Sequence, residues 1–152
     1  MTNQREWLDV LLVVEDDGFF ARSRSGAIWG TVYFQIGDGR FFPQRGWTDL
    51  VAGFVAAWLD GLLRVAGGIS KNERVAFFDG PFAVNISMPQ KGFVNLSFEH
   101  SEKSEMSKDV EAKQLLAHAD SVARELLSKC QHKGWENNDT VTLTRLIKQI
   151  RY

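Results

Sequence analysis

The stretch Phe41–Leu50, FFPQRGWTDL, marks the point where strand-like sequence changes into a long apolar run. Pro43 cannot donate to a β-ladder, so a preceding strand is expected to end there. Thr48 is a favoured N-cap residue, and Asp49 would lie at the positive end of a helix dipole. Trp47, just before the cap, is placed to pack onto the first helical turns. The stretch therefore predicts a corner between a strand and a helix.

The helix predicted after this corner runs from Leu50 to about Ala66 and stops at Gly67-Gly68. Almost all of its residues are apolar, so we expect it to be covered on most sides. Its charged residues Asp60 and Arg64 would each be costly at the centre of a bilayer. This segment is therefore predicted to be a buried helix of a globular protein and not a membrane span.

Strand patterns precede the helix. Residues 7–14 form an apolar run that ends at the turn cluster Glu15-Asp16-Asp17-Gly18. Residues 28–36 alternate between an aliphatic face and a face that carries Trp29 and Tyr33. The pair Asp38-Gly39 then predicts a type I′ turn into a short strand that ends at the corner.

Further strand patterns follow the helix. Residues 74–78, 81–88 and 93–100 predict a three-stranded antiparallel meander, and the polar residues 101–108 predict a linker. Apolar residues from Val110 to Cys130 recur at helical spacing, Gly134 stops that helix, and Asn137-Asn138-Asp139-Thr140 can cap a last one. The prediction is a single α+β domain over residues 1–152: an antiparallel sheet of about five to six strands and a buried central helix within 1–100, and two C-terminal helices within 108–152.

Composition limits the partners. The 152 residues carry a net charge of −1 with a pI of about 6.3, so no basic field is present to hold nucleic acid directly. Residues 1–60 hold eight Asp or Glu against five Arg, so a cationic partner would prefer this half. The single cysteine and the lack of a secretory signal pattern at the start favour the cytoplasm.

No stretch of the chain contains a complete catalytic, phosphate-binding or metal-binding motif. Cys130 lies on the apolar stripe of a predicted helix, where a buried thiol is inert. The residues His100, His118 and His132 are far apart and never adopt the spacing of metal ligands. We therefore predict no catalytic residue, no metal and no cofactor.

Two surface features remain as candidates. The adjacent carboxylates Glu15, Asp16 and Asp17 can attract a cation or a basic partner, or simply form a solvated turn. Trp29 and Tyr33 form an interface-like aromatic patch if their face of the strand is open to water, with Trp7, Leu11 and Val13 pointing the same way from the first strand. If a C-terminal helix covers that face, these residues belong to the core.

The corner FFPQRGWTDL, Trp58-Leu59 and the later segment Phe77–Phe82, FFDGPF, together resemble a group of small bacterial proteins encoded near polymorphic toxins. The resemblance covers Ile28 to Phe82 and lies in scaffold residues. Members of the group are suspected to be immunity proteins. The resemblance implies a non-enzymatic chain that binds and neutralises a cognate toxin domain.

The predicted contact surface for that toxin is acidic and aromatic, so that charge complementarity speeds encounter and buried rings supply affinity. It consists of Glu15, Asp16, Asp17, Trp29, Tyr33 and Asp38. The alternative is a small-molecule-binding or enzymatic α+β domain, with a pocket between sheet and helix that uses Asp60, Arg64 and Asp79. A deep pocket lined by perturbed carboxylates would favour the alternative, and a flat aromatic patch would favour the binder.

Overall fold

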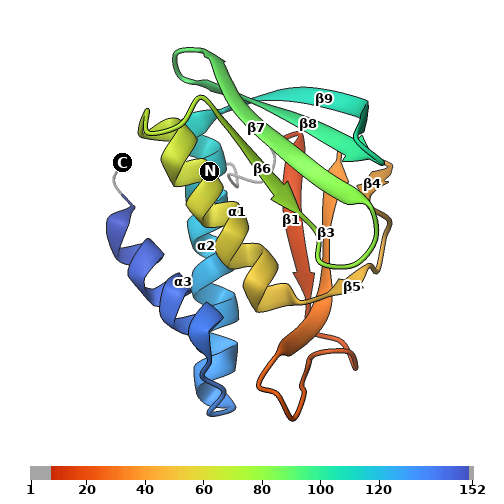
Figure 1. The fold of residues 1–152 in the computed structure, drawn as a ribbon, viewed down its shortest axis with the longest axis vertical. Coiled ribbons are helices and arrows are strands. Elements are labelled where there is room, and N and C mark those ends of the chain that lie inside the picture. Colours follow the sequence, from red (N-terminus) through yellow and green to blue (C-terminus); the bar gives the residue numbers. More distant parts are fainter. Residues whose placement is uncertain (1–7, 151–152) are drawn as a thin grey trace.

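The computed structural model describes residues 8–150 (Figure 1). Its strands form two antiparallel sheets. The first contains β1 (Val10–Glu15), β2 (Ala21–Arg22), β3 (Ile28–Ile36), β4 (Arg40–Phe42) and β5 (Thr48–Asp49), and β3 pairs with each of the other four. The second has the order β6 (Asn72–Ala76), β7 (Phe82–Gln90), β8 (Phe93–His100) and β9 (Lys103–Glu111). The helices are α1 (Val51–Ala66), α2 (Ala112–His132) and α3 (Asn138–Gln149).

The α+β class, the central helix and the two C-terminal helices are confirmed, and the strands divide between two sheets. Helix α1 lies in the middle, between the sheets and the pair α2 and α3 (Figure 1). Phe34 of β3 joins these layers, because its ring makes edge contacts with Phe54 and Trp58 of α1 and with Phe77 and Phe98 beside or within the second sheet. Such aromatic pairs stabilise a core beyond their buried area.

The corner differs from its prediction at the first helical residues. Thr48 is not the N-cap, because Thr48 and Asp49 form β5 and pair with Thr31 and Gly30 of β3. The helix starts one residue after Leu50, which occupies the cap position without a side-chain cap bond. Trp47 packs on Phe82 of the second sheet, with ring centroids 5.2 Å apart.

Asp49 ties the corner to the second sheet. Its carboxylate is fully buried. Oδ1 accepts from the N–H groups of Leu50 (2.7 Å) and Phe78 (3.2 Å), and Oδ2 accepts from Asp79 N–H (3.1 Å) and from Nε1 of Trp47 (3.0 Å). Four donors thus converge on one buried charge, which is the condition under which a carboxylate can be kept inside a protein.

Two turns also differ from their predictions. Ile36 pairs with Arg40, so three residues connect β3 to β4, and Gly37 takes the left-handed conformation with φ +64°. Asp38 has no positive φ, and the expected two-residue type I′ turn is therefore absent, although the short strand β4 forms.

The predicted linker at 101–108 is wrong. Ser101 and Glu102 both adopt left-handed backbone (φ 52° and 69°), and Lys103 pairs with His100, so the polar segment folds back as β9. A two-residue loop of this shape normally uses Asn or Gly, and β9 has few apolar residues. Neither the turn nor the strand therefore has the usual sequence signal.

The C-terminal helices follow their patterns closely. Asn137 caps α3 as expected, since its Oδ1 accepts from Thr140 N–H (3.0 Å) and the Thr140 hydroxyl oxygen accepts from Asn137 N–H (2.9 Å). Helix α2 starts at Ala112, because Val110 is still part of β9. None of the helices within residues 8–150 combines the length and the apolar character that crossing a bilayer requires.

We predict that Asp49→Asn lowers the free energy of unfolding by about 3 kcal/mol, because an amide nitrogen would replace an oxygen that accepts two N–H groups and would leave both without an acceptor. Urea denaturation monitored by tryptophan fluorescence measures the change. Asp38→Asn, on the exposed β3–β4 turn, is the control and should shift stability by less than about 0.5 kcal/mol. A loss below about 1 kcal/mol at position 49 would contradict the role assigned to this carboxylate.

Candidate functional site

The acidic turn is a structured loop between β1 and β2. Asp17 Oδ1 accepts from Phe19 N–H (3.0 Å), and its Oδ2 accepts from the Thr31 hydroxyl (2.8 Å). Asp16 lies 3.7 Å from the ammonium group of Lys129 on α2. These contacts connect the loop to β3 and to α2. They also leave the Phe19 ring 62% exposed.

This loop lies beside the turn that joins α2 to α3. The rings of Phe20 and Trp135 are 5.0 Å apart, and Nδ2 of Asn137 donates to the Gly26 carbonyl at 2.8 Å. Figure 1 shows both turns at the same end of the molecule. Segments more than 100 residues apart in sequence therefore form one surface.

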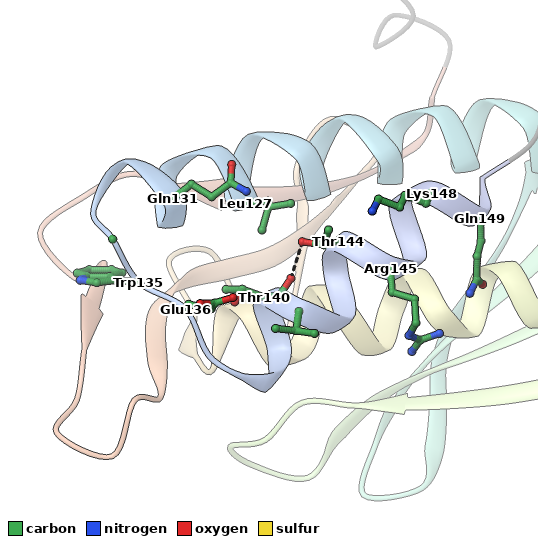
Figure 2. Close-up of a pocket in the computed structure, with 11 residues that line it drawn as sticks. Leu127, Gln131, Trp135, Glu136, Thr140, Thr144, Arg145, Lys148 and Gln149 are labelled. Atoms are coloured by element: carbon green, nitrogen blue, oxygen red, sulfur yellow. Dashed lines mark hydrogen bonds between the residues drawn. The ribbon is translucent and has the colours of Figure 1, made fainter.

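A groove of about 830 Å³ runs along α2 and α3 from this surface. In Figure 2, Leu127 points from α2 toward α3 and Gln131 lies along α2, with Trp135 at one end of the groove and Gln149 at the other. Val141, which is exposed, adds an apolar side chain from the first turns of α3. The groove combines apolar walls with a rim of polar and charged residues.

Trp29 and Tyr33, predicted as one patch, have different surroundings. Trp29 is 38% exposed, whereas Tyr33 is only 4% exposed, which corrects the prediction for Tyr33. The Tyr33 hydroxyl donates to Glu15 Oε1 at 2.7 Å, and its ring makes an edge contact with Phe41 at 5.8 Å. Burial, together with Glu15, raises the pKa of Tyr33 to about 12, against a smaller opposing effect of Arg45.

A second cleft lies where Tyr33 and Glu15 meet α2. It has a volume of about 330 Å³ and is bounded by β1, Arg45 and one side of α2. His118 of α2 is buried at its wall, and its Nε2 accepts from Leu12 N–H at 2.8 Å. This bond requires a neutral imidazole ring with its proton on Nδ1. It also gives a hydrogen-bond acceptor to the Leu12 N–H, which lies on the edge of β1 that pairs with no described strand.

The remaining predicted site residues do not gather. Asp38 lies on the turn after β3, at the opposite end of that strand from Trp29. Asp60 and Arg64 form an ion pair (3.2 Å) on the surface, and Arg64 is also 3.6 Å from Glu73. Asp79 meets neither, since its N–H binds Asp49. Asp60 and Arg64 line a surface hollow of about 580 Å³, but Asp79 does not, so the three residues of the alternative hypothesis share no pocket. Trp7 lies outside the described residues.

Cys130 is fully buried within α2, and burial raises the pKa of its thiol to about 11. Within residues 8–150, His, Cys, Asp and Glu side chains form no group of three or more arranged to hold a metal ion. The groove along α2 and α3 and the cleft beside β1 are two surface hollows where a partner or a ligand can bind.

In the comparisons with known proteins, no family model, curated protein or solved structure matches this chain, so the fold and the site are interpreted from the chain alone.

Sequence reasoning missed Phe19, Arg45, His118 and Trp135. Of these four, only Trp135 could have been singled out from the sequence. It directly follows Gly134, which ends α2, and a large aromatic ring at such a position usually packs against a neighbouring part of the chain.

We predict that tyrosine absorbance during alkaline titration shows one residue ionising near pH 12 and that Tyr33→Phe removes this step. The usual tyrosine pKa is about 10, so the folded state holds the proton more tightly than the unfolded chain. The stabilising effect is therefore complete below pH 10 and is lost between about pH 10 and 12. Ionisation of both tyrosines of the native chain near pH 10 would contradict the burial of Tyr33.

Proposed function

We propose that this chain is a non-enzymatic, cytoplasmic immunity protein that binds one toxin domain and neutralises it by covering its surface. The proposal rests on one observation: the β1–β2 loop and the α2–α3 groove meet at one end of the molecule and form a continuous surface. There, Phe19 is exposed on a loop fixed by Asp17 and Asp16, and Trp135 connects the loop to the groove. We call this combination the loop–groove surface.

A fixed exposed ring is an effective anchor for a protein partner. Binding requires side chains and loops to lose conformational freedom, and a loop already held by internal bonds loses little. Aromatic and large apolar side chains at the centre of an interface carry most of its affinity. Phe19 and Val141 provide such groups at the loop and in the groove.

Charge has a smaller part in this proposal than apolar contact. Asp16 and Asp17 are exposed on the loop, but Arg22 and Arg24 are exposed on the same segment between β1 and β3. The two signs nearly cancel, so a long-range acidic field toward a basic toxin is weak. Glu15 is engaged by Tyr33, which leaves Asp16, Asp17 and Trp29 as the members of the predicted contact set near this surface.

We expect the product of the adjacent gene, if it is a toxin, to form a complex with this chain, and Phe19→Ala to raise the Kd about thirtyfold. This change corresponds to about 2 kcal/mol, the usual threshold for an interface anchor. Calorimetry with a catalytically inactive toxin variant measures Kd, and survival of cells that express the active toxin measures protection.

Phe93→Ala is the matched control, because Phe93 is 42% exposed on β8, in the other sheet. It should leave both the Kd and the protection unchanged. Absence of a complex at micromolar concentrations would reject the proposed function. An equal loss in Phe93→Ala and Phe19→Ala would reject the loop–groove surface as the contact.

A further inference from the structure

The cleft between β1 and α2 shares no lining residue with the α2–α3 groove, although Lys129 at its border also binds Asp16 of the β1–β2 loop. Within residues 8–150, β1 pairs only with β3, so its outer edge is free to face a helix. Helix α2 runs alongside that edge (Figure 1), and His118 fixes it there through Leu12 N–H. A helix beside an edge strand leaves a hollow above the sheet face, and here the hollow is about 330 Å³. Small-molecule sites begin at about this volume.

Two opposite charges line this cleft without pairing. Glu15 and Arg45 both contribute to its wall. Neither forms an ion pair with the other or with any other described residue, whereas Lys129 and Glu125 at the same cleft are paired at 3.8 Å. Arg45 also interacts with the Tyr33 hydroxyl, which donates to Glu15. A carboxylate and a guanidinium that line one hollow and form no ion pair with each other are complementary to a ligand that carries both charges.

Neighbouring side chains set the position of each charge. The Arg45 guanidinium lies over the Phe41 ring, 5.6 Å from its centroid. Glu15 is oriented by the Tyr33 hydroxyl, which occupies Oε1, and Oε2 accepts no hydrogen bond from residues 8–150. A second acceptor position is therefore available on the Glu15 carboxylate.

We propose that this cleft binds a small zwitterion of the α-amino acid class, with the ligand carboxylate on Arg45 and its ammonium group on Glu15. A simple anion would gain from Arg45 but would face the charge of Glu15, and a simple cation would meet the reverse problem. Only a molecule with both groups satisfies both residues. The paired Lys129 and Glu125 border the cleft without adding net charge.

The test titrates the purified full chain with each of the common L-α-amino acids by calorimetry. Propionate and propylammonium are the matched probes with one charge each. We expect at least one amino acid to bind saturably, and both single-charge probes to bind at least about tenfold more weakly. The proposal is overturned if no amino acid reaches saturation when its concentration is raised to about 10 mM. A Kd above this concentration corresponds to a binding free energy weaker than about 3 kcal/mol. Equal binding of propionate also overturns it, because the cleft would then be an anion site.

Two variants localise the binding. Glu15→Gln keeps an acceptor for Tyr33 and removes only the charge, and Arg45→Gln changes an exposed side chain that the core does not need. Each should weaken the amino acid about tenfold or more, and the exposed controls Glu102→Gln and Arg24→Gln should not. Unchanged affinity in either site variant overturns the assignment. This result is independent of the toxin experiment, because the titration uses no protein partner.

Discussion

The buried carboxylate of Asp49 is the constraint on which the rest of the structure depends. It binds one N–H at the start of α1, one indole at the corner and two N–H groups in the β6–β7 loop. Removing a charge from water is unfavourable unless its donors are fixed around it. Asp49 can therefore be buried only when the first sheet, the central helix and the second sheet are all in place. It makes the α1 corner and the second sheet one cooperative unit, and the Phe34 aromatic contacts complete that unit.

This long-range role explains which parts of the fold could be predicted from sequence. Helices α2 and α3 and strand β3 follow periodicity and capping rules that operate within a few residues, and the pattern locates them well. Asp49 could not be interpreted locally, because Phe78 and Asp79 are 29 and 30 residues away. In the sequence, Thr48 followed by an acidic residue resembles the start of a helix. Only the tertiary structure shows that Thr48 and Asp49 form a short strand that pairs with β3.

Strand β9 shows a different limit. Its residues are mostly polar because it is an edge strand, and its register shifts opposite Phe98 and Glu99, near Glu105. Charges and a bulge on an edge prevent further strands from adding to it, so the same properties that protect the sheet remove the apolar signal of a strand.

The candidate site was predictable only in its acidic loop and Trp29. The burial of Tyr33, the groove and the cleft all depend on where α2 packs, which no local pattern contains.

The corner stretch that first suggested a purely structural role also contributes to the cleft. Arg45 lies between β4 and β5, and the end of this connection next to β5 is fixed at Trp47, which accepts from Val32 N–H through its carbonyl (2.8 Å) and donates its indole N–H to Asp49. These bonds fix the backbone two residues from Arg45, which lines the cleft together with Glu15. A ligand that meets charges already in place gives up little binding energy to order them. The buried carboxylate that joins the corner to the second sheet therefore also fixes, through the Trp47 indole, the connection that carries Arg45 to the cleft.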